Sequence, residues 1–344
     1  MKGPMQPRAL ARWEVLLIVI LLLLVWLGTR LSPVFLSPGN FSNLTVAEME
    51  IAIIAVPMTL IIIGGEIDLS VESMVGLASA VLGFLWAAGV PLEVGIPIVL
   101  VMGLLGGLLN GVLVMRAGLP SLVVTLGTLA LFRGLASVVL GPRAISNFPA
   151  AFTAFGFGNV PGTPVPWPLV VFGVLAAVVG VVLHRTWFGR QVFAVGKNQG
   201  AARYSGVPVV RLKVGLFMLS GLLSALAGVI LTSRLSSARS DAGTGMTLAV
   251  VTAVLLGGVN IFGGSGTMLG VVLAVFTLAV LQNALRLADI ATELQSISVG
   301  LLLIVSVVVP NLARQLARLL QRARAEKNPT RGAPERVPPY TPAL

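Results

Sequence analysis

The chain has 344 residues, of which 56% are hydrophobic and only 10% are charged, with a formal net charge of +11. A soluble domain carries about 25% charged residues. So few charged side chains cannot cover a water-soluble globule of this size, and lipid must be the solvent for much of the exterior. The composition excludes a soluble globular domain and predicts an all-α, polytopic membrane protein.

The positive charge does not indicate a nucleic-acid partner. Aromatic residues make up only 6% of the chain, and the basic residues lie between apolar runs rather than on a polar domain. The chain has no cysteine and one histidine, His184, which is expected to be a water-facing anchor at the end of a span. This composition excludes disulfides, thiolate metal sites and multi-histidine metal sites, and we expect neither a metal nor a cofactor.

Apolar runs of about 17–25 residues, the length that crosses a bilayer, predict the membrane spans. The first run follows Lys2, Arg8 and Arg12 but lacks a small-residue cleavage pattern, so we expect a retained span rather than a signal peptide. The ten predicted spans are residues 14–31, 46–63, 74–89, 94–115, 121–140, 167–184, 214–233, 247–261, 267–285 and 294–311.

The distribution of basic residues predicts the orientation. With the N-terminus in the cytoplasm, 17 of the 23 lysines and arginines lie on the cytoplasmic side, which favours cytoplasmic termini at both ends. We expect residues 1–312 to form the transmembrane domain. Residues 313–344 would be a cytoplasmic tail, disordered beyond about residue 325 because it is rich in proline and charge.

The segment 64–73 contains Glu66, Asp68 and Glu72, with no basic residue close in sequence. Paired glycines end the preceding helix here, and Ser70 is one candidate to cap the next helix. Two interpretations stay open. The segment is a polar cytoplasmic turn with solvated acids, or it is a helix break beside a transport pathway, where irregular backbone must face protein or water.

The fourth span carries Gly103, Gly107 and Gly111 at intervals of four residues, and small residues including Gly221 and Gly228 repeat similarly on the seventh. Such faces predict close packing of helix backbones within the membrane.

For the polar residues elsewhere in the chain, two interpretations also stay open, a structural role and a role in the transport pathway. Asn110 within the fourth span needs a hydrogen-bond partner, from a neighbouring helix or from a polar path. The external loop 234–247 either lines a ligand entrance or is plain interface polarity. A second glycine break, 257–266, is predicted to correspond to 64–73 in two related halves of the protein. The candidates for the translocation path are Asp68, Ser70, Asn110, Arg239, Asp241 and Asn260.

The loops on the two sides of the membrane differ. Residues 141–166 carry five prolines and predict an irregular external loop with a short surface helix. Residues 185–213 are longer than a plain connection and predict a strand-like stretch, then a helix over 199–205 that ends at Gly206. This segment either presents a small helix to a cytoplasmic partner or binds nothing. The docking candidates are Gly189, Arg190, Gly196, Asn198, Ala201, Arg203, Ser205 and Gly206.

No catalytic constellation is present in the sequence. No glycine-rich phosphate loop with a lysine at the expected spacing occurs, so we expect that the chain does not itself hydrolyse ATP. A membrane enzyme is disfavoured because no acid–base pair can be named. A standalone secondary transporter, which would carry coupling carboxylates or bases within its spans, remains an alternative.

Three separated segments resemble the ribose-type permease subunits of ATP-binding-cassette sugar importers. Residues 65–73 read Gly-Glu-Ile-Asp-Leu-Ser-Val-Glu-Ser and depart from many relatives at Glu66 and Glu72, where those have glycine. The other two segments are 189–206, with Gly-Arg, Ala-Val-Gly-Lys-Asn and Ala-Ala-Arg-Tyr-Ser-Gly, and 256–266. Residues 147–153 and 237–241 resemble autoinducer-2 permeases most closely, and rhamnose permeases are also similar.

The resemblance implies a transport subunit of the cytoplasmic (inner) membrane without its own ATPase. It implies a second permease chain, identical or similar, and an extracytoplasmic sugar-binding protein. A cytoplasmic ATPase subunit would dock on residues 189–206 and drive alternating access. The implied ligand is a monosaccharide or autoinducer-2, and a branched-chain amino-acid-type permease of the same broad class is the alternative.

Overall fold

The structure is a computed structural model in which residues 7–306 and 308 are described. These residues form helices and no strand, with only two isolated bridges between extended residues, so the all-α prediction is confirmed. The helices are α1 (Pro7–Leu31), α2 (Pro38–Ile63), α3 (Val71–Ala87), α4 (Leu92–Met115), α5 (Ser121–Leu140), α6 (Ala150–Phe157), α7 (Trp167–Arg185), α8 (Trp187–Lys197), α9 (Gln199–Tyr204), α10 (Val209–Leu235), α11 (Met246–Leu256), α12 (Met268–Leu287) and an unlabelled helix Thr292–Ser306.

Each of the ten predicted spans overlaps one of these helices. Seven of the described helices are long and apolar enough to cross a membrane, and three further apolar helices, α3, α11 and Thr292–Ser306, are shorter. The chain is therefore a polytopic membrane protein. The predicted tail, 313–344, and the last residues of the final predicted span lie outside the described residues.

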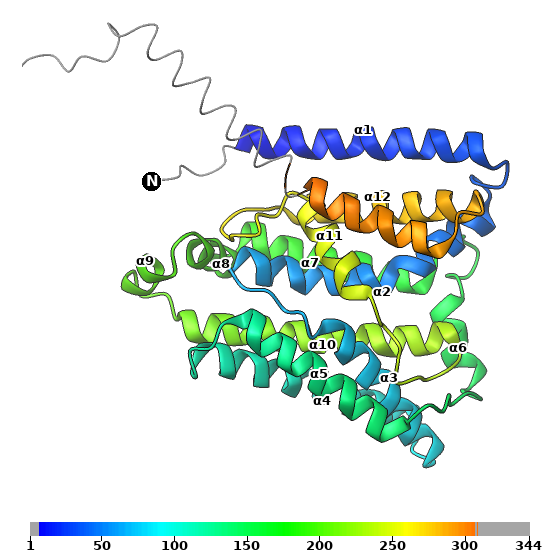
Figure 1. Ribbon diagram of the computed structural model, residues 1–344, viewed down its shortest axis with the longest axis horizontal. Coiled ribbons are helices and arrows are strands. Elements are labelled where there is room, and N and C mark those ends of the chain that lie inside the picture. Colours follow the sequence, from blue (N-terminus) through cyan, green and yellow to red (C-terminus); the bar gives the residue numbers. More distant parts are fainter. Residues whose placement is uncertain (1–6, 307, 309–344) are drawn as a thin grey trace, which may run out of the picture.

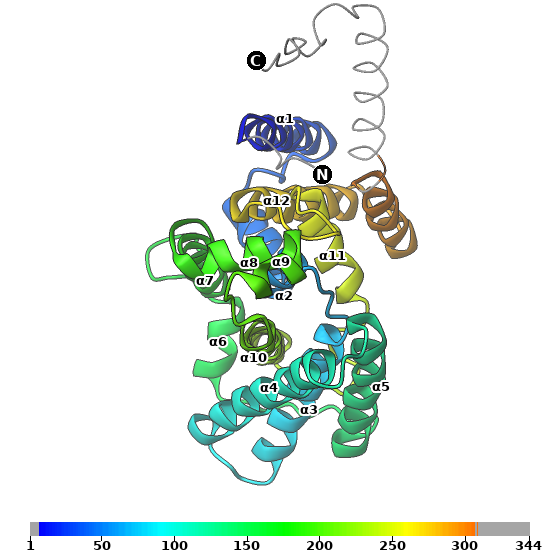
Figure 2. The same ribbon diagram turned by 90° about the vertical axis from the view of Figure 1, so that its left-hand side faces the viewer.

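Helix α2 lies near the centre of the bundle (Figure 2). All of its side chains from Ala52 to Ile63 are buried, as expected for a helix that is apolar on every side. Helices α7, α10, α11 and α12 pack around it. Helix α1 lies at the edge of the bundle beside α12 (Figure 1). Its exposed side chains include Leu22 and Trp26, which point outward where lipid is expected.

The predicted glycine faces are confirmed as sites of close helix packing. A Cβ atom at Gly107 of α4 would lie 2.1 Å from the carbonyl oxygen of Phe217 in α10, and one at Gly221 would lie 2.1 Å from that of Gly103. Gly228 brings α10 close to α3, where a Cβ atom would lie 2.6 Å from the carbonyl oxygen of Val75. Small residues let these backbones touch, which gives packing without a hydrophobic driving force between helices.

The two long loops differ in how well they were predicted. The short surface helix within 141–166 is confirmed as α6. The strand-like stretch predicted after residue 185 is wrong, because these residues form helix α8. Thr186 caps α8 at its start, and the inward-facing Gly189, Val192 and Val195 recur every three residues. The helical period therefore prevails over the short apolar run that had indicated a strand.

Candidate docking surface and buried polar groups

Helices α8 and α9 form a hairpin at one end of the bundle (Figures 1 and 2). The turn between them is fixed by Asn198, whose Oδ1 accepts a hydrogen bond from the backbone N–H of Ala201 at 2.9 Å. The predicted helix over 199–205 is confirmed as α9. Gly206 follows with φ of +83°, a left-handed conformation that favours glycine after a helix end.

The predicted docking residues divide between the outer and inner sides of this hairpin. Gly189 and Gly196 face inward: a Cβ atom would lie 1.9 Å from the Leu183 carbonyl oxygen at Gly189 and 1.8 Å from the Ile63 carbonyl oxygen at Gly196. Beside them the hairpin presents Tyr204, which is 97% exposed. The exposed candidates are Arg190, Asn198, Ala201, Arg203, Ser205 and Gly206.

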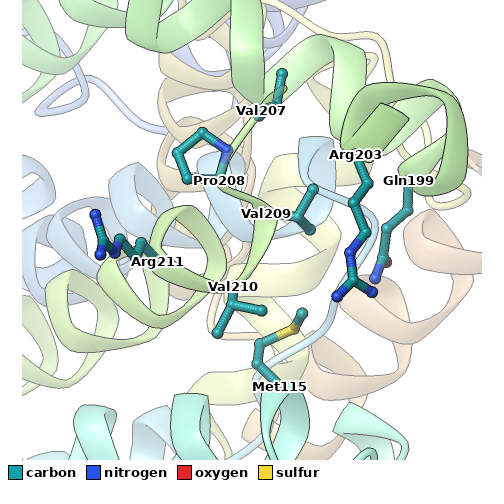
Figure 3. Close-up of a pocket in the computed structure, with 8 residues that line it drawn as sticks. All are labelled: Met115, Gln199, Arg203, Val207, Pro208, Val209, Val210 and Arg211. Atoms are coloured by element: carbon teal, nitrogen blue, oxygen red, sulfur yellow. The ribbon is translucent and has the colours of Figure 1, made fainter. Parts of the chain in front are cut away.

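A cavity of about 360 Å³ lies between α9, the start of α10 and the end of α4. Arg203 and Gln199 extend from α9 along one side of it, with Val209 between them and Met115 of α4 (Figure 3). The cavity thus has a basic residue of the hairpin, Arg203, and one of α10, Arg211, beside an apolar floor.

The inner side of the hairpin contacts both glycine breaks. Gly196 lies between the end of α2 and the α11–α12 turn, where the N–H of Gly264 donates to the carbonyl oxygen of Ile63 at 2.8 Å. The helix ends at Gly65 and Gly258 have the same backbone form, with φ of +82° and +84° and the same pair of closing hydrogen bonds. Any displacement of α8 therefore acts directly on the end of α2 and on the α11–α12 turn.

Lys213 of α10 joins the hairpin to the acidic segment. Its Nζ donates to Oε1 of Glu66 at 2.5 Å and to Oε1 of Gln199 at 2.7 Å, and its side chain is only 3% exposed. Although the acidic segment has no base nearby in sequence, the fold supplies one. Glu72 likewise lies 3.7 Å from Arg133, whose Nη1 also donates to the carbonyl oxygens of Ser240 and Ala242 in the α10–α11 loop.

Three of the six predicted pathway residues meet in one buried cluster. Oδ1 of Asp68 accepts from the hydroxyl of Ser70 at 2.6 Å, and that Oγ also accepts from Nδ2 of Asn110 at 2.9 Å. The hydroxyl of Ser220 in α10 donates to the second oxygen of Asp68 at 2.8 Å. Asn110 thus bonds the start of α3, while its own Oδ1 has no partner among the described residues. Sequence reasoning did not identify Ser220.

The other three pathway candidates lie apart from this cluster. Arg239 and Asp241 form a two-bond ion pair, at 2.8 and 2.7 Å, in the α10–α11 loop. The hydrogen bonds from Arg239 lower the pKa of the exposed Asp241 carboxyl. Asn260 closes the α11–α12 turn by accepting from the N–H of Phe262 at 3.2 Å. The pathway role of all six residues stays a prediction.

Two carboxylates inside α2 were not identified from the sequence. Glu50 accepts from Arg234 of α10 at 2.7 Å, and Glu48 lies 3.4 Å from Arg286 of α12. Both carboxylates are almost completely buried. The available signal was two acids within an apolar span, an arrangement that usually requires an ionic partner.

Residues 40–307 match the family described as branched-chain amino acid transport system / permease component. The chain belongs to this permease family. It is 41% identical over 302 residues to the autoinducer 2 import system permease protein LsrD of Yersinia enterocolitica, covering 86% of this chain and 91% of that protein.

LsrD of Yersinia pseudotuberculosis is 38% identical over 324 residues, which cover 92% of this chain and 97% of that protein. LsrD of Yersinia pestis has the same identity and coverage. No solved structure matches the chain significantly. The permease family membership confirms the resemblance seen in the three sequence segments.

Proposed function

We propose that the chain is the permease subunit of an ATP-driven importer in the cytoplasmic membrane, and that autoinducer-2 or a related monosaccharide is its ligand. ATP hydrolysis takes place on a separate cytoplasmic subunit. The observation that carries this proposal is the α8–α9 hairpin, which exposes Tyr204 and Arg203 at one end of the bundle and holds Gly196 against the end of α2 and the α11–α12 turn.

The hairpin suits a docking role because its outer face is exposed to a partner and its inner face is packed against the bundle. The outer face offers an aromatic side chain, Tyr204, and a basic one, Arg203, beside an apolar cavity, and aromatic and arginine residues often dominate protein interfaces. On the inner face, Gly196 lies against the backbone of Ile63, so the hairpin cannot move without moving the end of α2. A push on the hairpin is therefore transmitted to α2 and to the α11–α12 turn.

Lys213 supplies the second connection in this proposal. It ties Gln199 of the hairpin to Glu66, and Glu66 lies two residues before Asp68 in the buried cluster. Because Asp68 is bonded to Ser220 of the same helix α10, the acidic segment is held to α10 at two levels. The hairpin, α10 and the start of α3 would shift together when an ATPase changes shape.

In this topology both termini and the hairpin face the cytoplasm, and residues 1–312 form the transmembrane domain with residues 313–344 as its cytoplasmic tail. A second permease chain, identical or similar, encloses the path with this one, and an extracytoplasmic binding protein delivers the ligand near the loop of Arg239 and Asp241. The ligand assignment is supported by the names of the LsrD relatives.

Two alternatives have specific support. The family description names branched-chain amino acids. A standalone secondary transporter is favoured by Glu48 and Glu50, which are intramembrane carboxylates of the kind that couple transport to protons. Both carboxylates are, however, already paired with arginines, which favours a structural role for them.

The docking role is tested by copurification of the chain with its ATPase subunit. Arg203→Glu reverses one exposed charge on α9 and should reduce copurification at least tenfold, while membrane insertion is unchanged. Arg143→Glu changes an exposed arginine of the loop before α6, at the other end of the bundle, and should have no effect. Equal copurification of both variants with the ATPase would count against docking on the hairpin.

The orientation is tested separately. The chain has no cysteine, so Ser205→Cys introduces a unique thiol into the hairpin. A membrane-impermeant maleimide should label it in inside-out vesicles and leave it unlabelled in intact spheroplasts. Labelling from the periplasmic side alone would overturn the orientation and the docking role together.

A further inference from the structure

A second cavity, of about 280 Å³, lies away from the docking hairpin, beside Ile51 at the middle of α2 and Met246 at the start of α11. It is formed by α2, the α10–α11 loop, α11, α12 and the helix Thr292–Ser306. Gln282 lines it fourteen residues beyond the start of α12 at Met268, which corresponds to about 20 Å along the helix axis. The cavity therefore lies near the side from which the proposed importer receives its ligand.

The polar side chains that line this cavity are all uncharged. They are Thr244, Gln282, Thr292, Gln295 and Ser296, and the apolar remainder of the wall includes Ile51 and Met246. A few convergent polar groups on an apolar wall are typical of small-molecule sites, whose volumes begin at about 300 Å³.

The polar groups have hydrogen-bonding capacity left over. Nε2 of Gln295 donates to the carbonyl oxygen of Ile290, which leaves its Oε1 free to accept. The hydroxyl of Ser296 donates to the carbonyl oxygen of Thr292 at 3.1 Å and keeps its lone pairs. The Gln282 amide makes no hydrogen bond with another described residue. The wall thus offers N–H donors, on the Gln282 and Gln295 amides, as well as oxygen acceptors, and both can bond the hydroxyl groups of a ligand.

Two acidic residues near the cavity, Glu50 and Glu72, are bonded to other parts of the protein. Glu50, the neighbour of Ile51 in α2, is bonded to Arg234. Glu72 accepts from the N–H groups of Gly245 and Thr247, both at 3.1 Å, and so holds the start of α11 in place. Among the described residues that line the cavity none is charged, so the wall offers no partner for the ammonium and carboxylate of an amino acid, and burying either of them unpaired is costly.

We propose that this cavity is a ligand-contact site for a small, uncharged, polyhydroxylated molecule, with the Gln282 amide as its central hydrogen-bonding group. The inference rests on the proposed importer function and adds the place and chemical class of recognition. It favours a sugar-like ligand over the branched-chain amino acid alternative.

Transport by the complete importer, reconstituted in proteoliposomes, tests the site. The probes are autoinducer-2, ribose and rhamnose, with leucine as the amino-acid comparison. Gln282→Leu keeps the side-chain size but removes its hydrogen bonds, and should lower uptake of the transported probe at limiting concentration about three- to tenfold. Basal ATP hydrolysis and copurification with the ATPase should be unchanged.

A matched pair of serines supplies the control. Ser296 and Ser137 are both exposed helix residues whose hydroxyls bond the carbonyl oxygen four residues earlier at 3.1 Å. Only Ser296 lines the cavity. The transported probe should slow maleimide labelling of Ser296→Cys by at least threefold and should leave the labelling of Ser137→Cys, on α5, unaffected.

The possible results separate the two proposals. If the wild-type importer takes up a sugar-like probe but Gln282→Leu transports it equally well and Ser296→Cys is not protected, the site is wrong and the importer function stands. Protection or uptake with leucine alone would overturn the polyhydroxylated class. If the wild-type importer transports none of the four probes, the proposed ligand class fails and this site fails with it.

Discussion

The ion pair between Lys213 and Glu66 allows the clearest quantitative prediction. Lys213 is 3% exposed and Glu66 is 17% exposed, and Nζ lies 2.5 Å from Oε1. In Glu66→Gln the buried ammonium keeps only neutral partners, including the Gln199 carbonyl oxygen. Breaking a buried ion pair in this way costs about 3–5 kcal/mol. Because Glu66 retains some contact with solvent, we expect a loss near the lower limit, about 3 kcal/mol.

Lys213→Met leaves the Glu66 carboxylate unpaired, but its partial exposure lets water compensate, so a loss of about 2 kcal/mol is expected. The double variant removes both charges and should regain most of the lost stability. The free energy of unfolding in detergent, measured for all four proteins, gives the coupling energy of the pair, expected to be about 2 kcal/mol or more.

Transport measurements distinguish whether the Lys213–Glu66 pair only stabilises the fold or also transmits movement of the hairpin to the acidic segment. If Lys213 connects the hairpin to the acidic segment, the double variant will be stable but will import less ligand per ATP hydrolysed than the wild type. Neutralising the exposed pair, with Arg239→Gln and Asp241→Asn, should leave stability unchanged. A coupling energy of zero would refute the energetic reasoning, and wild-type transport by the double variant would refute the transmission.

Three further predictions concern packing and buried charge. Gly196→Ala places a Cβ atom 1.8 Å from the Ile63 carbonyl oxygen, so the hairpin must shift and copurification with the ATPase should be lost. Arg234→Met leaves the buried Glu50 carboxylate without its partner and should destabilise the protein by about 3–5 kcal/mol, measured by chemical unfolding. Gly107→Ala forces α4 away from α10 and should cost about 1–3 kcal/mol or more, by the same measurement.

Each of these predictions has a control within the chain. Gly200→Ala on α9 meets nothing closer than Oδ1 of Asn198 at 3.4 Å, and Gly127→Ala on α5 meets nothing within 4 Å. Both alanine variants should behave as wild type. For the buried pair, adding Glu50→Gln to Arg234→Met should recover stability. A docking loss in Gly200→Ala equal to that in Gly196→Ala, or no recovery in the double variant, would contradict the proposed causes.

The sequence predicted those features of the fold that depend on local pattern. Apolar runs located the helices, and the four-residue glycine spacing located the contact between α4 and α10, because backbone approach requires small residues wherever it occurs. Helix α9 was predicted because residues 185–213 are longer than a plain connection between spans and because Gly206 indicates where the helix ends. The error at α8 arose because a short apolar run of strand-like residues does not distinguish a strand from one side of a helix.

The buried polar contacts could not be predicted because they join residues far apart in sequence. Glu66 and Lys213 are 147 residues apart, Asp68 and Ser220 are 152 apart, and Glu50 and Arg234 are 184 apart. Glu66 and Asp68 were singled out from the sequence and Glu50 was not, but the partner of each acid depends on which helix packs beside it. His184 gives a smaller example. It was expected to be a plain anchor, yet its Nε2 accepts from the N–H of Met268 at 3.2 Å.

The central claim is that this chain is a conduit driven by a separate ATPase. Its most direct test is uptake of labelled autoinducer-2, ribose and rhamnose into vesicles that contain the chain with its partners, with ATP supplied and then withheld. The proposed importer gives uptake of at least one of these probes only when both ATP and the ATPase subunit are present. Equal uptake by the chain alone, driven by an ion gradient without ATP, would contradict it.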